Sequence, residues 1–464
     1  MKRRTHVALL ATLMSATAWG QEVSLYGTTM AQMWKSETPG FDKATFTPAT
    51  QYLGIDATKL GTDRLSLHLF GWGRTDLGDA SNFDGSKDGS KNGGYLNYGY
   101  LRYRFDRANA EIKAGRFTVQ QSTGFEQVDG VAARTDLRGG FTVSAFVGKP
   151  VLYKTVDPRD QHDYEFQRDV IFGTRLGWRL PQVGEFGLSY LQDGTKAAKD
   201  LTIPSPVDYT RKQLGADLLV APTATFGLRG RTVFDIASHE AQAPGAPDRS
   251  RVAEHDYTAT VKIGSQVTVS GNFAERNFFA YFAGTNLPSL FRQDDRDMFK
   301  GWGGSVTWNT PWSIQVVADY RHMHRELYGD VNRMGGELRW ANAEKTIQAG
   351  AAGHYVNAAK TLLVDSATPY RSLKHAEARL WGMVTKGKFS ASLDGILQRY
   401  SEANPHLNGL TNVYEMVGSL GYQATSSLRV SGDLSYGSTP VAKSETRGLL
   451  KAEYRFGFGK KGGQ

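Results

Sequence analysis

The sequence predicts an all-β fold, a transmembrane β-barrel of antiparallel strands, and three observations support this prediction. A segment of about ten residues with apolar side chains at every second position recurs about twenty-two times. Short and long connections alternate between these segments. After residue 20 there is no apolar stretch long enough to span a bilayer as a helix, which leaves a closed barrel as the spanning structure. In the clearest segment, one face carries Leu428, Val430, Gly432, Leu434 and Tyr436, and the other carries Arg429, Ser431, Asp433 and Ser435.

The first twenty residues have the pattern of a secretory signal peptide. Lys2, Arg3 and Arg4 precede an apolar stretch that runs from Val7 to Ala16, and small residues follow it. Cleavage after Gly20 is favoured over cleavage after Ala18. No linker or change of composition divides the remainder, so the sequence predicts a signal peptide over 1–20 and one barrel domain over 21–464.

Composition excludes several classes of protein. The 52 glycines, the 11% aromatic residues and the absence of long apolar runs suit many strands and turns with one wetted face. The formal charge of +9 is modest and no basic run interleaves with aromatics, so nucleic acid is not an expected partner. With no cysteine, the chain cannot hold a disulfide, a thiolate metal cluster or a covalently attached c-type haem, and no cofactor is expected.

The strands are predicted in chain order from the alternation and the turn residues between them. The count is about twenty-two, with 16 to 20 kept as alternatives, and the boundaries are uncertain by a few residues. The predicted ranges are 22–35, 47–59, 62–76, 94–107, 108–118, 129–137, 140–149, 164–180, 183–194, 207–221, 223–238, 251–265, 267–282, 296–309, 312–326, 331–343, 345–359, 372–386, 388–402, 411–425, 427–439 and 445–459.

The connections predict which end of each strand faces the periplasm, because outer-membrane barrels have short periplasmic turns and longer outer loops. Short turns are expected at 106–108, 138–139, 221–222, 310–311, 343–344, 386–387 and 425–426, and long loops at 36–46, 77–93, 150–163, 195–206, 239–250, 283–295 and 360–371. Aromatic residues at strand ends predict two interfacial girdles. The periplasmic one is Phe105, Trp178, Phe186, Phe226, Trp308, Trp312, Trp340, Phe389 and Tyr422, and the outer one is Trp34, Trp72, Tyr190, Tyr328, Tyr355, Tyr400 and Tyr436.

The polar face of the strands carries many charged residues, which are the predicted pore-lining residues: Arg102, Arg104, Lys113, Arg175, Arg179, Arg229, Arg231, Arg321, Arg339, Arg379, Arg429, Asp319, Glu337 and Glu377. Further acids on that face include Glu111, Asp217, Asp394 and Asp433. One interpretation is a wall of ion pairs around a water-filled channel. The other is that arginines without a partner form a positive path, which predicts a weak preference for anions.

One segment carries a resemblance to known proteins. A strand ending in Ala114-Gly115-Arg116, a loop over 119–128 and a strand starting with Asp129-Gly130-Val131 resemble the strand, Gly-Arg, loop and Asp-Gly pattern of Gram-negative outer-membrane porins. The resemblance covers this segment and the regular spacing of the strands along the chain. It implies a loop that folds inward and narrows the channel, which would place Arg116, Glu126 and Asp129 near a constriction; a surface hairpin remains the alternative. The strand with Tyr454, Phe456 and Phe458 matches the last strand of porins, but the tail over 459–464 departs from their pattern.

Two weaker patterns concern metals. Residues 84–89 resemble the start of a calcium loop, but Tyr95 stands where the bidentate glutamate would be. His322 and His324 share a strand face without a third ligand, and their parity points outward. We therefore expect a mobile outer loop and a polar rim instead of metal sites. No pairing of serine with histidine is distinctive, so no enzymatic activity is expected.

Two functional hypotheses follow. The first is a passive porin-like channel for small hydrophilic solutes or ions. It would lie in the lipid of the outer membrane of a Gram-negative bacterium, where it could form a homo-oligomer. The second arises because a barrel of about twenty-two strands is wide and no plug domain precedes Val23. Its lumen could then hold a multihaem cytochrome that supplies the haem, with the barrel as an insulating sheath for electron transfer.

Overall fold

The computed structural model describes residues 22–37, 44–78, 92–151, 170–193, 211–236, 252–277, 298–325, 329–358, 374–403, 409–439 and 442–458. The predicted signal peptide and the calcium-like segment at 84–89 lie outside these ranges. Within them, no helix is long and apolar enough to cross a membrane.

The described residues form one antiparallel sheet of strands, with a single 3-10 turn, η2, at Arg138–Gly140. The strands are β1 (Glu22–Glu37), β2 (Ala44–Phe46), β3 (Pro48–Thr58), β4 (Leu65–Asp76), β5 (Asn92–Arg104), β6 (Glu111–Gln121), β7 (Gly124–Asp136), β8 (Phe141–Pro150), β9 (Ile171–Leu180), β10 (Gly184–Asp193), β11 (Arg211–Thr223), β12 (Phe226–Asp235), β13 (Val252–Ile263), β14 (Val267–Asn277), β15 (Met298–Asn309), β16 (Ile314–Arg325), β17 (Gly329–Ala341), β18 (Ile347–Ala358), β19 (His375–Lys386), β20 (Phe389–Tyr400), β21 (Asn412–Thr425), β22 (Leu428–Thr439) and β23 (Ala442–Phe458).

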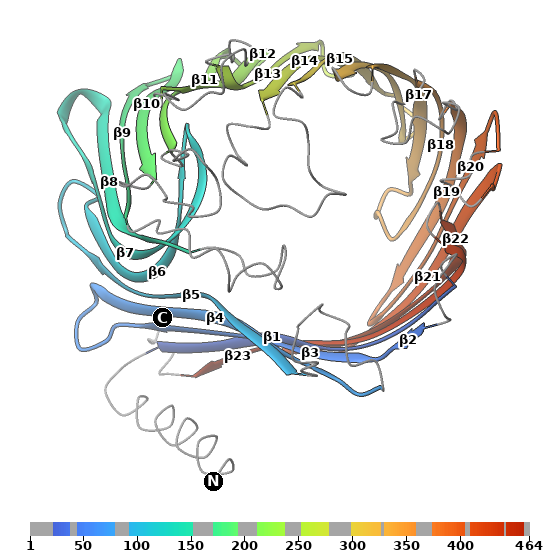
Figure 1. Ribbon diagram of the computed structural model, residues 1–464, viewed down its shortest axis with the longest axis horizontal. Helices are drawn as coiled ribbons and strands as arrows, with labels where there is room; N and C mark the ends of the chain where they lie inside the picture. The colour runs from blue at the N-terminus through green and yellow to red at the C-terminus, as the bar shows by residue number, and fades with distance from the viewer. Residues whose placement is uncertain are drawn as a thin grey trace, which may run out of the picture.

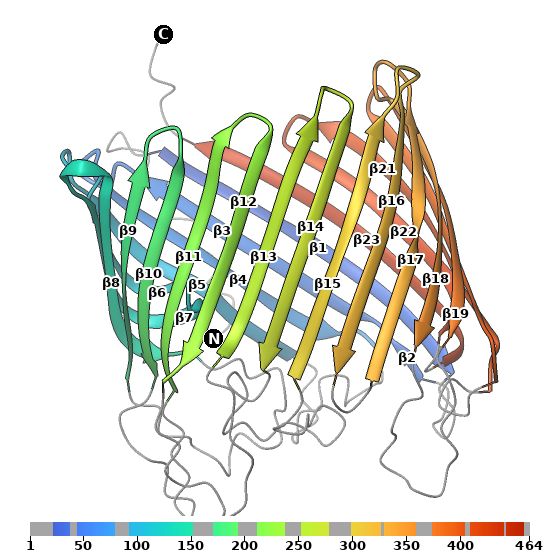
Figure 2. The same cartoon turned by 90° about the horizontal axis from the view of Figure 1, so that it is seen from above.

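The sheet closes on itself into a barrel (Figure 1). Each long strand pairs with its neighbours in sequence, and β1 pairs with β23 from Val23 opposite Phe458 to Glu37 opposite Ser444. The three-residue strand β2 pairs only with the end of β1, so the wall consists of 22 spanning strands. The strands are tilted relative to the barrel axis, and the short turns lie together at one end (Figure 2). Closure pairs the first spanning strand with the last, so the sheet has no free terminal strand, which is the condition for strands to cross lipid.

The outer face of the barrel is apolar. Leu380, Leu420 and Leu450 are 68%, 70% and 66% exposed and lie on the face away from the lumen, as do most of the large exposed hydrophobic side chains of their strands. Exposure on this scale is unfavourable in water but favourable in hydrocarbon. The alternation predicted from sequence therefore continues around the closed sheet and identifies a transmembrane barrel.

The predicted strand count and order are confirmed, with boundaries shifted by a few residues. The largest difference is at 119–128, where a loop was predicted and the structure has the ends of β6 and β7 joined by a tight turn. The described part of β9 begins at Ile171, and residues 164–169 of the strand predicted over 164–180 lie outside the described residues.

The prediction of aromatic girdles holds at the periplasmic end but is partly wrong at the outer end. Trp178 and Phe141 stack outside the wall with ring centroids 5.8 Å apart, and Trp308 and Trp340 are exposed there too. At the outer end, Tyr355 and Tyr436 face outward, whereas the inward-facing aromatics are Trp34, Trp72 and Tyr400. Position at a strand end does not by itself decide which face an aromatic ring occupies, because alternate residues point to opposite faces. Tyr328 lies outside the described residues.

Candidate functional site

The hairpin formed by β6 and β7 bends into the lumen. β6 pairs with β5 only from Glu111 to Arg116, and its tip then crosses to strands further around the wall. The Ser122 Oγ lies 2.8 Å from the Oγ of Ser189 on β10, and the Ser122 hydroxyl also donates to Asp217 on β11. Figure 1 shows the end of the hairpin inside the ring of strands. We call this segment, residues 117–128, the inward hairpin.

Glycines permit the bend at its base. Gly115 has φ +125°, a conformation that side-chain-bearing residues rarely adopt, and a Cβ there would lie 2.3 Å from the carbonyl oxygen of Gly99. On the partner strand, a Cβ on Gly130 would lie 2.1 Å from the Val147 carbonyl oxygen. Both positions therefore require glycine for the close approach of neighbouring backbones.

An apolar cluster holds the inward hairpin against the inner wall. Phe117 and Val128, which face each other across the hairpin, pack on Phe146, Ile171 and Leu191 of β8, β9 and β10. All five side chains are at most 4% exposed. Burying side chains of this size contributes about 1.5–3 kcal/mol each, so the cluster stabilises the inward position substantially.

A charged cavity of about 730 Å³ lies between the inward hairpin and the wall. Arg175 makes a bidentate contact with Asp217, with nitrogen to oxygen distances of 3.1 and 2.7 Å, and a third bond of 3.1 Å to Glu185. Glu185 also accepts a hydrogen bond from Arg179 at 3.0 Å. Because Asp217 binds both Arg175 and the Ser122 hydroxyl, this ion-pair network and the tip of the inward hairpin form one connected structure.

A second network continues along the wall beyond the cavity. The Glu254 carboxylate, with only 3% of its side chain exposed, lies 2.6 Å from Arg231 and 2.8 Å from Arg276. One buried carboxylate therefore pairs with guanidinium groups from the strands on both sides of it, and it offsets one of their two positive charges.

Replacing Glu254 by Gln is expected to lower stability, because Arg231 and Arg276 would be left beside each other without their shared anion. The expected loss is about 1–3 kcal/mol, reduced from the fully buried case since both arginines reach solvent. The measurement is the temperature at which the folded barrel loses its compact migration on a denaturing gel. Asp433→Asn, on the same lumen face and in no ion pair among the described residues, is the matched control. An unchanged transition in the Glu254 variant would contradict this.

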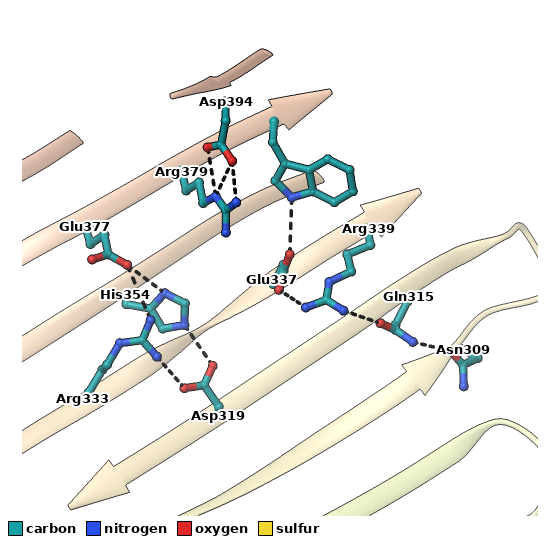
Figure 3. Close-up of polar contacts among 11 residues, drawn as sticks. Asn309, Gln315, Asp319, Arg333, Glu337, Arg339, His354, Glu377, Arg379 and Asp394 are labelled. Atoms are coloured by element: carbon teal, nitrogen blue, oxygen red, sulfur yellow. Dashed lines mark hydrogen bonds and ion pairs between the residues drawn. The ribbon is translucent and has the colours of Figure 1, made fainter. Parts of the chain in front are cut away.

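The opposite wall carries a third network, drawn in Figure 3. Asp319 contacts Arg333 at 3.1 Å and the Nε2 of His354 at 2.9 Å, and Glu377 lies 3.5 Å from the same Arg333. His354 is 8% exposed and sits between the two carboxylates. These groups come from β16, β17, β18 and β19, so the network ties four adjacent strands together.

Two further ion pairs flank this network (Figure 3). Arg339 contacts Glu337 at 2.6 Å, and Arg379 contacts Asp394 through both carboxylate oxygens. The indole Nε1 of Trp381 donates to Glu337 at 3.4 Å.

The other predicted pore-lining residues have fewer charged contacts. Lys113 and Arg104 contact Glu111 at 3.2 and 4.0 Å. Arg102 and Arg429 donate to the hydroxyls of Ser66 and Ser390. The side chains of Arg229 and Arg321 have no hydrogen-bond or ion-pair partner within the part of the chain that the structure describes. By register, all of them lie on the face opposite the exposed apolar side chains.

The three residues expected near a constriction lie on the β6–β7 hairpin but on different faces. Arg116 and Asp129 form a bidentate pair at 2.7 and 2.8 Å, and Arg116 also donates to the Leu96 carbonyl and lies over the Tyr95 ring. This pair faces away from the apolar cluster and ties the base of the inward hairpin to β5. Glu126, opposite Val119, lies on the face of the hairpin that carries Phe117 and Val128.

Sequence reasoning missed the role of Ser122 and the apolar cluster, although a signal for the latter was present. In β6 the outward apolar residues Ile112 and Ala114 are even-numbered, but Phe117 and Val119 are odd-numbered. A switch of apolar parity at Gly115 indicates that the strand stops facing lipid there and buries its other face.

His322 and His324 lie on the outer face near the rim, as their parity predicts. His324 Nδ1 is 2.7 Å from Asp330, and His322 Nδ1 is 2.8 Å from Asn332. The described residues contain no cluster of three or more potential metal-ligating side chains.

No protein-family model and no curated protein matches the sequence. Among solved structures, the chain is similar to OccAB4 of Acinetobacter baumannii, with a TM-score of 0.46 and 10% identity over 94% of this chain and 98% of that one. It is also similar to the translocation pore of the P pilus usher PapC, with a TM-score of 0.45 and 10% identity over 93% and 99%. OpdK of Pseudomonas aeruginosa, crystallised with vanillate, has a TM-score of 0.42 and 11% identity over 94% and 98%. The chain's own geometry establishes a 22-strand transmembrane barrel with a hairpin folded into its lumen.

Proposed function

We propose that the protein is a porin-like channel of a Gram-negative outer membrane through which small hydrophilic solutes or ions diffuse passively. The observation that carries this proposal is the inward hairpin, which an apolar cluster fixes against a lumen wall that carries many polar and charged side chains. Such an element narrows a wide barrel, and charged side chains on the wall then act on solutes that pass. The proposal includes no catalytic step.

The distribution of charge supports a weak preference for anions. Most lumen-face arginines are neutralised by carboxylates, as in the networks of Arg175, Arg339 and Arg379. Among the exceptions are Arg229 and Arg321, whose side chains have no partner among the described residues. A few uncompensated cations on a largely neutral wall lower the entry barrier for anions only slightly.

The test of this preference is the reversal potential of the purified barrel in a planar bilayer under a salt gradient of about tenfold. The sign is expected to indicate anions, and the double variant Arg229→Gln, Arg321→Gln is expected to move the potential toward the cation side. Lys59→Gln removes a cation that is paired with Glu22 in a turn outside the wall and is the control. A wild-type barrel with clear cation selectivity would rule out the anion preference.

The alternative, a sheath around a multihaem cytochrome, predicts a different preparation. A barrel purified without harsh denaturant would then carry a stoichiometric haem absorbance band and conduct poorly. The inward hairpin favours the channel, because it already occupies lumen space that a protein partner would need. Conductance of the barrel alone, without a haem band, supports the channel.

A further inference from the structure

A group of aromatic rings lines the lumen side of the wall around the closure of the barrel. Tyr26 of β1, Tyr52 of β3, Phe70 of β4 and Tyr98 of β5 all face inward by register, on strands that lie side by side in Figure 1. Phe70 is at the centre, with ring centroids 6.3 Å from Tyr26, 6.3 Å from Tyr52 and 5.5 Å from Tyr98. We call these four residues the aromatic floor.

The rings lie along the wall with their faces toward the lumen. A Cβ on Gly54 would lie 2.3 Å from two ring carbons of Tyr26, so this ring covers the backbone of β3. The planes of Tyr26, Tyr52 and Tyr98 are within 14°, 17° and 24° of the Phe70 plane, which extends the same orientation across the floor. The hydroxyls of Tyr26 and Tyr98 are 2.9 Å apart and fix the two rings relative to each other.

A cavity of about 640 Å³ adjoins the aromatic floor, and two carboxylates and two guanidinium groups line it. Its two carboxylates are occupied, since Asp56 lies 2.7 Å from His68 and Glu453 lies 3.2 Å from Lys451. Its two guanidinium groups differ from them. Within the described ranges, the Arg429 side chain donates only to the Ser390 hydroxyl, and the Arg455 side chain has no partner.

We propose that this cavity binds organic acids that carry a six-membered ring, with the ring on the aromatic floor and the carboxylate on Arg455. A flat array of ring faces binds another ring face, aromatic or saturated, better than it binds a compact ion. An available guanidinium beside Tyr26 pairs with a carboxylate in a fixed geometry. Aromatic acids and sugar acids share this chemistry. The inference names a solute class for the proposed channel, but binding itself does not require that the barrel conducts.

The experiment is isothermal titration calorimetry on the purified full-length barrel in detergent. Benzoate and galacturonate are the ring-bearing acids and distinguish an aromatic from a sugar source. Acetate has the charge without the ring, and benzyl alcohol has the ring without the charge. We expect at least one ring-bearing acid to bind about tenfold or more tightly than both acetate and benzyl alcohol. The proposal would be overturned if acetate bound as tightly as the ring-bearing acids. It would also be overturned if neither benzoate nor galacturonate bound.

Two variants test the residues separately. Arg455→Gln and Phe70→Leu are each expected to weaken binding of the ring-bearing acid about tenfold or more. Arg321→Gln, a lumen arginine on β16 that is equally without a partner among the described residues, is the matched control and should bind as the wild type does. Compact migration on a denaturing gel shows that each variant is folded. Wild-type affinity in folded Arg455→Gln would overturn the assignment of the carboxylate.

Failure here and failure of the channel proposal give different results. A barrel that conducts ions but binds neither acid overturns the aromatic floor as a binding site and leaves the channel intact. A barrel that binds a ring-bearing acid but does not conduct supports the site and overturns passive diffusion.

Discussion

A Phe117→Ala barrel is expected to conduct about twice as much current as the wild type, or more, because the inward hairpin loses its main apolar anchor. Phe117 is 1% exposed and packs on Phe146, Ile171 and Leu191. Removing a buried phenylalanine side chain costs about 3–5 kcal/mol of stability. Without it, only a few hydrogen bonds at the tip would hold the hairpin against the wall, and we expect the hairpin to be released.

The measurement is single-channel conductance in a planar bilayer, compared over many insertions. Phe125→Ala is the matched control, because Phe125 is on the same hairpin but is 61% exposed on the face away from the apolar cluster. Equal conductance of Phe117→Ala and the wild type, with both folded, would show that the inward hairpin does not limit the path.

A disulfide between positions 122 and 189 is expected to fix the inward hairpin to the wall. The Ser122 and Ser189 side-chain oxygens are 2.8 Å apart, and a disulfide bond needs sulfur atoms at about 2.0 Å, a change that small rotations can supply. The sequence has no cysteine, so the double variant Ser122→Cys, Ser189→Cys has only these two thiols. We expect it to oxidise almost completely and to migrate differently with and without reductant.

The same disulfide distinguishes release of the inward hairpin from general damage. Added to Phe117→Ala, it is expected to return the conductance to the wild-type value when oxidised and to lose this effect on reduction. Ser122→Cys with Ser392→Cys, which lies on β20, is the control pair and should stay reduced. Efficient cross-linking of the control pair, or none in the test pair, would place the tip of the hairpin elsewhere.

Much of the fold could be predicted because its determinants are local. Each strand is recognised by the alternation of apolar and polar side chains over about ten residues, and turn residues separate one strand from the next. The face of Arg429 or Leu434 follows from parity alone, and the register between neighbours then follows from short turns such as the one at 425–428. Closure needs no special motif, since a lipid environment leaves no stable open edge.

The candidate site depended on contacts between residues far apart in the chain. Ser122 meets Asp217 across 95 positions, and Tyr26 meets Tyr98 across 72. The segment 119–128 was predicted to be a loop, but it forms the ends of β6 and β7. Its packing against β8–β10 could not be read from the sequence.

The sequence by itself determined the barrel, its strand order and the two faces of its wall, because alternation is a property of each strand alone. The tertiary structure decided the direction of the hairpin around Phe117, the partners of the lumen arginines and the flat packing of Tyr26 over Gly54. These features depend on which strands curvature brings opposite each other, and no local pattern contains that information.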